Sequence, residues 1–231
     1  AEIRNKYSNK LIYLITKFLE NLVFKISDYS TSVSNKEKNK IYKIYKTKTN
    51  LYPNAININD KNLKKYKNKD YLIYSGSYLY KPNKDAIDYL NDNIMPNIIK
   101  KFPNLKLVIT GGGFKKKFPW LINKGIVSKK KLYNLIYNSK CMCIPLKFGS
   151  GTRIKIIEAL MLGAVVISSS KGIEGIRINK KNPPFIANDK TKIIKIITKI
   201  LNNFNKIKKI SNEEKYFYKR NYSMKNVTQD F

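Results

Sequence analysis

The stretch Gly149-Ser-Gly-Thr-Arg-Ile-Lys-Ile-Ile-Glu158 is the part of this sequence that decides its fold. Its glycines let the backbone turn tightly after a short apolar run, residues 141–144, and before an amphipathic segment. We expect Ser150 or Thr152 to cap the helix that follows. The first amides of such a helix have no partner within it and carry partial positive charge, so they suit an anion. The stretch therefore predicts a strand, a phosphate-binding loop and a helix.

Charged side chains continue this pattern along the predicted helix. Arg153 and Lys155 add two cations within one turn, and Glu158 lies about 9 Å along the axis from Thr152. Cations and amides suit a diphosphate, and a carboxylate suits the two hydroxyls of a ribose. We therefore expect these residues to bind a nucleotide diphosphate that carries a sugar: Gly149, Ser150, Gly151, Thr152, Arg153, Lys155 and Glu158.

Simpler interpretations of the same stretch stay open. Gly-Ser-Gly is common in ordinary loops, and Lys155 could be a solvated helix lysine. A surface pair of Arg153 with Glu158 is less convincing, because residues five apart do not face one another on a helix. The spacing of a Walker loop, G-x-x-x-x-G-K, is absent, so a nucleoside-triphosphatase loop is not predicted.

The chain is strongly basic. Its 231 residues, 42% of them apolar, are enough for one large domain or for one domain with a fragment of another. There are 47 basic and 15 acidic side chains, a formal net charge of +32, and only four of the cations are arginine. Lysine, Asn, Ile and Tyr are abundant throughout, as expected from an A/T-rich genome; selection for an anionic partner is the alternative. Such a chain is expected to be drawn to anionic lipids at low salt.

Other composition features narrow the class of protein. Cys141 and Cys143 alternate along a predicted strand, which indicates a buried core pair in a reducing cytosol rather than a disulfide framework. The chain has no histidine, so we expect no metal site. No run of about 18 apolar residues occurs, so no membrane span is expected. The sequence starts without Met and shows no signal peptide, and we expect a fragment or a processed chain.

Hydrophobic periodicity predicts the order of helices and strands. An amphipathic helix over residues 11–26 is expected to pack on a core; the alternative is a basic helix lying on a membrane surface. A short strand within 28–34 and a helix over 35–48 follow. Strands are then predicted at 71–75, 105–110, 141–144, 165–169 and 185–187. Helices are predicted between them at 82–101, after Ser128, and from the Gly149 loop to residue 162. A further helix is predicted at 190–201.

This alternation predicts an α/β fold with a parallel sheet and helices on both faces. Glycine clusters follow four of the strands, at Gly76, residues 111–113, the Gly149 loop and residues 172–175. Because ligands bind at the carboxyl ends of parallel strands, these clusters are expected to converge on one cleft.

In this order, the motifs resemble the C-terminal, donor-binding half of GT-B glycosyltransferases, in the large retaining group classed as family four. The matching segments lie within residues 50–225 and are strongest in the stretch from Pro145 to Gly163. The fold that this resemblance implies is a Rossmann-like parallel sheet with helices on both faces, the C-terminal half of a GT-B fold.

The resemblance also implies roles for individual residues. Glu158 would hold the donor's ribose hydroxyls, and Arg153 and Lys155 would stabilise the leaving diphosphate. Further donor contacts are implied for Gly76, Lys81 and Val127, the last through its backbone near the nucleobase. Many members carry a second glutamate eight positions before this one, where this chain has Ser150, which affects how the sugar ring would be held.

The implied activity is sugar transfer from a UDP-, GDP- or ADP-sugar to a glycan or lipid-linked acceptor, with retention and without a metal or other cofactor. The resemblance places no catalytic base in these residues; the base would lie in an absent N-terminal domain. Residues 1–50 are expected to be a remnant of that acceptor domain with a linker helix. Residues 51–215 would form the nucleotide-sugar-binding domain, and 216–231 a helical tail packing back toward the N-terminal domain.

The sequence leaves two other functions open. The chain could be a non-catalytic nucleotide-binding module, or a basic fragment that binds anionic surfaces through charge alone. No motif for specific nucleic-acid recognition is present. A cytoplasmic location, peripheral at the inner face of a membrane, follows from the family resemblance.

Overall fold

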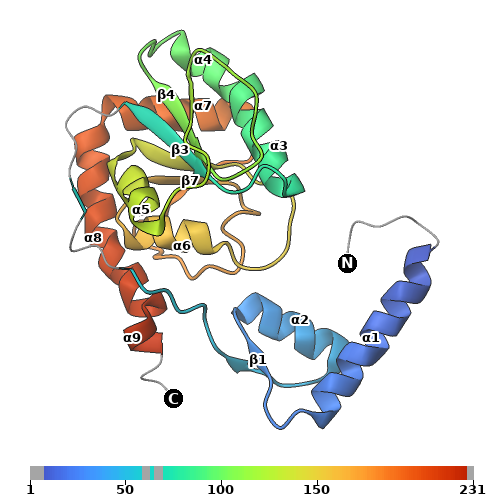
Figure 1. Ribbon diagram of the computed structural model, residues 1–231. Coiled ribbons are helices and arrows are strands. Elements are labelled where there is room, and N and C mark those ends of the chain that lie inside the picture. Colours follow the sequence, from blue (N-terminus) through green and yellow to red (C-terminus); the bar gives the residue numbers. More distant parts are fainter. Residues whose placement is uncertain (1–7, 59–62, 65–69, 228–231) are drawn as a thin grey trace. The chain divides into compact units, whose positions relative to one another are not determined.

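The computed structural model describes residues 8–58, 63–64 and 70–227, and it divides the chain into two units (Figure 1). The N-terminal unit is Ala1–Pro53 and the C-terminal unit is Asn54–Phe231. The parts of the predicted domains that fall on residues 1–7, 59–62, 65–69 and 228–231 lie outside the described residues. Helix α8, Phe204–Tyr222, runs across the domain boundary predicted at residue 216, so residues 216–222 continue a helix of the C-terminal unit.

The N-terminal unit contains two helices and two short paired strands. They are α1 (Ser8–Ile26), β1 (Thr31–Ser32), α2 (Asn35–Tyr45) and β2 (Asn50–Leu51). Ser34 caps α2 by accepting a hydrogen bond from the backbone N–H of Glu37, at 3.2 Å. Strands β1 and β2 pair in parallel. The predicted helices of this region are therefore present, and the strand predicted within 28–34 is reduced to two residues.

Helix α1 contacts α2 through Glu20 and Phe24, on the side opposite its main apolar stripe. The Tyr45 ring lies 5.1 Å from that of Phe24, and the Tyr45 hydroxyl donates to Glu20. The apolar side of α1, which we call the α1 apolar face, is exposed: Leu11, Ile12, Leu14, Ile15, Phe18, Leu19, Leu22, Val23 and Ile26. Whether a protein core or a membrane covers this face stays a prediction. Among the described residues, no helix is both long and apolar enough to cross a membrane.

The C-terminal unit is built on six parallel strands in the order β5-β4-β3-β6-β7-β8. Their bounds are β3 Tyr71–Ser75, β4 Lys106–Thr110, β5 Leu121–Asn123, β6 Cys141–Ile144, β7 Val166–Ser168 and β8 Phe185–Ile186. The predicted parallel α/β sheet is confirmed. Strand β5 was not predicted, because three residues are too few to show a periodicity.

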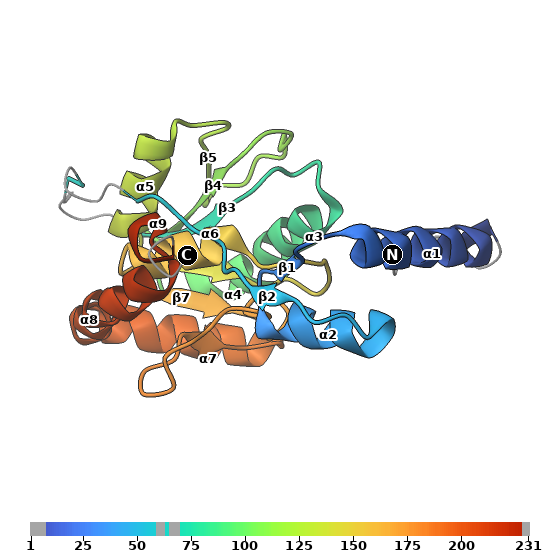
Figure 2. The ribbon, with the colours of Figure 1, turned by 90° about the horizontal axis from the view of Figure 1, so that it is seen from below.

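Helices cover both faces of this sheet (Figure 1). They are α3 (Lys81–Tyr89), the π-helical η1 (Leu90–Ile94), α4 (Met95–Ile99), α5 (Lys129–Asn138), α6 (Ile154–Met161), α7 (Lys190–Asn202), α8 and α9 (Met224–Val227). Helices α3, α4 and α7 lie on one face, and α5 and α6 on the other. Helix α8 packs against both α6 and α7 (Figure 2).

The helix predicted over residues 82–101 is interrupted by the π-helical turn η1. Pro96 stands at the start of α4, where it has no N–H to give to the carbonyl four residues earlier. A wider π turn accommodates that missing bond without ending the helix. The apolar residues of the turn, Leu90 and Ile94, are completely buried.

The centre of the sheet forms the core. Strands β3 and β6 are buried along nearly their whole length, and each fully buried aliphatic side chain contributes about 1.5–3 kcal/mol. Cys141 and Cys143 are buried free thiols, which confirms the predicted core pair. Burial raises the pKa of the Cys143 thiol to about 12, so it stays protonated and unreactive.

The strand order creates a switch point between β3 and β6. The chain runs outward from β3 to β4 and β5, returns to β6 beside β3, and then continues to β7 and β8. Two loops therefore leave neighbouring strands in opposite directions at the same edge of the sheet. Ligands of open α/β sheets bind at such a point, outside the carboxyl ends of the strands.

Candidate functional site

The loop after β3 forms one side of the switch point. Its backbone is bonded to the end of β4, through Gly76 N–H to the Thr110 carbonyl and Tyr78 N–H to the Gly112 carbonyl, each at 2.9 Å. Gly76 has a φ of +150°, and a Cβ there would lie 2.6 Å from Asn83 and 2.9 Å from the Nζ of Lys155. Only glycine fits at this position, because side chains from α3 and α6 meet directly beneath it.

The ammonium of Lys155 is enclosed under this loop. It donates to the Asn83 Oδ1 at 2.7 Å, the Ser75 carbonyl at 2.8 Å and the Tyr74 hydroxyl at 3.1 Å. It also lies 4.4 Å from the centroid of the Tyr74 ring. The Tyr74 hydroxyl in turn donates to Asn83, at 2.9 Å. Lys155 therefore joins α6 to β3 and α3 across the switch point, and the alternative of a solvated helix lysine is wrong.

This enclosure changes the proton affinity of the lysine. Two causes lower the pKa of Lys155 from 10.5 to about 7. The larger is the loss of solvent around the ammonium, and the smaller is the nearby positive charge of Arg153. A bound anion would oppose both effects. A lysine that is only partly charged at neutral pH is typical of a functional site.

The loop from Gly149 to Arg153 forms the other side of the switch point. The Arg153 guanidinium folds back and donates to the carbonyls of Ser150 and Gly151. Its Nη2 is buried and has no hydrogen-bond partner among the described residues. A Cβ on Gly149, whose φ is +121°, would lie 2.8 Å from this Nη2. The loop thus wraps around an enclosed guanidinium, and the N–H donors on its Nη2 are unused within the described residues.

The predicted helix cap is wrong. The N-cap of α6 is Arg153, and no side chain makes a capping hydrogen bond there. Because the long Arg153 side chain closes the loop through backbone carbonyls, the helix begins only at Ile154, and neither Ser150 nor Thr152 is used as a cap. The amides at the start of α6 thus lack a side-chain cap. Amides without such a cap are the ones that can bind an anion at the N-terminus of a helix.

Glu158 lies one turn after Lys155 on the same side of α6. Its side chain is only 13% exposed, and Oε1 accepts a hydrogen bond of 2.8 Å from the Tyr133 hydroxyl of α5. The ammonium of Lys129 lies 3.9 Å from the same oxygen. Glu158 is therefore held by α5, and a surface pair with Arg153 is not what positions it.

Lys81 and Val127 are the other predicted residues outside the two loops. Lys81 opens α3 and lies over the Phe148 ring, 5.9 Å from its centroid, which brings the start of α3 next to the Gly149 loop. Val127 is half-buried, directly before the Ser128 cap of α5. Among the described residues, no group of three Cys, Asp or Glu side chains is arranged to hold a metal ion.

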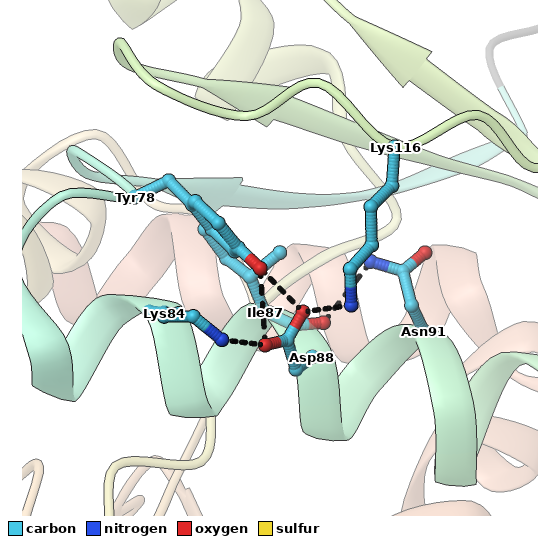
Figure 3. A network of polar contacts seen from close by, with 6 residues as sticks. All are labelled: Tyr78, Lys84, Ile87, Asp88, Asn91 and Lys116. Carbon is cyan, nitrogen blue, oxygen red and sulfur yellow. Dashed lines mark hydrogen bonds and ion pairs between the residues drawn. The ribbon is translucent and has the colours of Figure 1, made fainter.

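A polar network fixes the loop after β3 (Figure 3). Asp88 of α3 accepts hydrogen bonds from the Tyr78 hydroxyl at 2.9 Å, from Lys84 at 2.7 Å and from Lys116 at 3.0 Å. The Tyr78 ring also packs edge-on against Phe114, with centroids 5.0 Å apart. Three segments are thus tied together: the loop of Gly76, helix α3 and the loop after β4.

Sequence reasoning missed four residues that shape the site: Tyr74, Asn83, Tyr133 and Asp88. A signal was available for the two tyrosines, since each lies in an apolar strand or helix face and a buried tyrosine hydroxyl needs a partner. The partners themselves could not be read from spacing, because Tyr74 and Lys155 are 81 residues apart.

Comparison with known proteins places this geometry in a family. Residues 69–203 match the family described as glycosyl transferases group 1. The chain is 30% identical over 164 residues to an uncharacterized 44.6 kDa protein in the cps region of Klebsiella pneumoniae, covering 64% of this chain and 42% of that protein. It is 26% identical over 255 residues to an uncharacterized glycosyltransferase of Methanocaldococcus jannaschii, covering 100% and 64%. The chain thus spans less than two thirds of each relative's length.

Solved structures share the fold at low sequence identity. TarM of S. aureus superposes with a TM-score of 0.73 at 13% identity, covering 100% of this chain and 47% of that one. Anabaena HepE, solved with UDP-glucose, has a TM-score of 0.69 at 12% identity, covering 91% and 64%. The six-stranded parallel sheet is that of GT-B glycosyltransferases, and the chain belongs to the glycosyl transferases group 1 family.

Proposed function

We propose that this chain is the donor-binding half of a glycosyltransferase that moves a sugar from a nucleotide-diphosphate sugar to a glycan or lipid-linked acceptor. The observation that supports the proposal is that Arg153, Lys155 and Glu158 lie at the start of α6 and along it, after the loop that leaves β6 at the switch point, and that Lys155 is bonded to β3 and α3 on the other side. Family membership supports the reaction class, and the UDP-bound structures of HepE and TarM support a nucleotide-sugar donor.

In this proposal each charged group has a separate task. The unused donors of Arg153 and the uncapped amides of α6 bind the diphosphate, and Lys155, which lies under the loop after β3, adds a further positive charge. These cations stabilise the negative charge that grows on the leaving diphosphate, an effect that commonly contributes several kcal/mol to catalysis. The Glu158 carboxylate accepts hydrogen bonds from the ribose hydroxyls.

Retention of configuration, independence from metal ions and a cytoplasmic, membrane-peripheral location belong to the same proposal and rest on the family resemblance. Val127, Lys81 and Gly76 are proposed as further donor contacts. The catalytic base is assigned to no residue of this chain. The chain spans less than two thirds of the length of these relatives, so a nucleotide-binding module is the second candidate.

Calorimetric titration of UDP, GDP and ADP tests the proposal. We expect at least one of the three to bind, and Glu158→Gln or Arg153→Met to weaken it about tenfold or more, as loss of a hydrogen bond to a charged group does. Glu213→Gln and Arg220→Met, at exposed positions of α8, remove the same charges away from the site and should bind like the wild type. The proposal fails if no diphosphate binds, or if the site variants and the α8 variants behave alike.

A further inference from the structure

We infer that Tyr133 is a positioning residue that holds the Glu158 carboxylate in the orientation a ribose diol requires; the inference rests on the proposed nucleotide-sugar site. The two side chains come from different helices, α5 and α6, which pack together on the same face of the sheet. The bond from the Tyr133 hydroxyl to Oε1 of Glu158 is 2.8 Å long, a good length for an O–H donor.

The direction of this hydrogen bond is fixed by the surroundings of Tyr133. The residue is only 4% exposed. Burial, followed by the hydrogen bond to Glu158, raises the pKa of Tyr133 well above its ordinary value. Because burial favours the protonated phenol, the Tyr133 hydroxyl donates this hydrogen bond and Oε1 of Glu158 accepts it.

Lys129 cannot perform the same task. Its ammonium is 3.9 Å from Glu158, beyond a hydrogen bond, and its side chain is 63% exposed. An exposed pair of this kind contributes only about 0–1 kcal/mol and leaves the carboxylate free to turn. The Tyr133 side chain is rigid and enclosed, so its hydroxyl is the group that fixes the Glu158 side chain.

This arrangement has a consequence for the ligand. One oxygen of Glu158, Oε1, is already engaged by Tyr133, which leaves Oε2 and the second lone pair of Oε1 for the two ribose hydroxyls. A carboxylate held in advance loses less conformational freedom when the diol binds. The contribution of the Tyr133 hydroxyl should therefore appear only with ligands that carry those hydroxyls.

A cycle of two proteins and two ligands isolates this contribution. Tyr133→Phe removes the hydroxyl and keeps the buried ring. The ligands are whichever of UDP, GDP and ADP binds the wild type best, and its dideoxy form, which lacks both ribose hydroxyls. We expect the variant to bind the ribonucleotide about three- to tenfold more weakly and the dideoxy form within about twofold of the wild type. Tyr137→Phe, one turn further along α5, is the matched control and should change neither affinity.

Equal weakening of both ligands would show that the hydroxyl is merely structural, and unchanged binding of the ribonucleotide would show that it does not position Glu158. Either result overturns the inference. If the wild type binds both ligands equally and Glu158→Gln changes neither, the proposed ribose carboxylate itself fails. Thermal melting checks that Tyr133→Phe is folded; if it is not, Tyr133→Met, which also lacks the hydroxyl, takes its place in the same cycle.

Discussion

Lys155 has three oxygen acceptors around its ammonium, and yet its pKa is about 7 rather than 10.5. Since the pKa in the folded protein lies below that in the unfolded chain, charging Lys155 opposes folding below about pH 7. That penalty is lost as the pH rises from about 7 toward 10.5. A diphosphate bound nearby would reverse the balance, because its negative charge favours the protonated lysine. Binding should then be coupled to uptake of a proton.

We therefore predict that the affinity for a nucleoside diphosphate falls as the pH rises from 7.5 to 9.5, by up to about tenfold per pH unit. In this range the phosphates stay fully ionised, because their last pKa is near 6. Titrations in buffers of different ionisation enthalpy would measure the proton uptake directly. Lys155→Met should bind weakly with a flat pH profile, whereas Lys130→Met, on the exposed side of α5, should keep the slope. A slope that survives in Lys155→Met would assign it to another group.

At the scale of secondary-structure elements, Asp88 joins α3 to the loops after β3 and β4 (Figure 3). Burial alone would raise the pKa of this carboxyl, but hydrogen bonds from Lys84, Lys116 and Tyr78 outweigh it and lower the pKa below its ordinary value. A carboxyl with a lowered pKa stabilises the folded state above its unfolded pKa. This stabilisation disappears as the pH falls through the folded pKa.

Asp88→Asn is predicted to destabilise the protein by about 1 kcal/mol at pH 7, because three donors lose a charged acceptor while all remain partly solvated. Urea unfolding would measure the difference, which should shrink below about pH 4 as the wild-type carboxyl becomes protonated. Asp85→Asn removes the same charge one turn earlier on α3 and is expected to cost less. Equal costs for the two variants would mean that helix charge, and not the network, is responsible.

Helices and strands that depend on the pattern of neighbouring residues could be predicted, whereas features that depend on contacts formed in three dimensions could not. Strands β3 and β6 were predicted at their observed bounds, since each is a short apolar run that ends at a turn signal. The cap of α6 was not, because it depends on a guanidinium that folds back onto two carbonyls. The candidate site rests on charged residues at the start of α6 and within it. The prediction lacked Tyr133 and Asn83, whose contacts with Glu158 and Lys155 form only when distant helices pack together.

At the scale of the whole molecule, two kinds of anion binding must be separated. The net charge of +32 comes from side chains spread along the chain. Such charges attract any anionic surface and are screened within about 10 Å at 0.1 M salt. Arg153 and Lys155 are partly enclosed, so their interaction with a bound diphosphate should be screened much less.

We predict that the chain binds vesicles of phosphatidylglycerol and phosphatidylcholine at about 50 mM salt and is released at about 0.5 M, since each exposed lysine near the surface contributes about 1 kcal/mol that salt removes. Cosedimentation would measure this, with pure phosphatidylcholine vesicles as the control. Glu158→Gln should leave vesicle binding unchanged while it weakens nucleotide binding, so the two activities separate in one variant. Vesicle binding that persists at high salt would instead point to insertion of the α1 apolar face. Replacing Phe18 and Leu22 there by Ser would then have to abolish it.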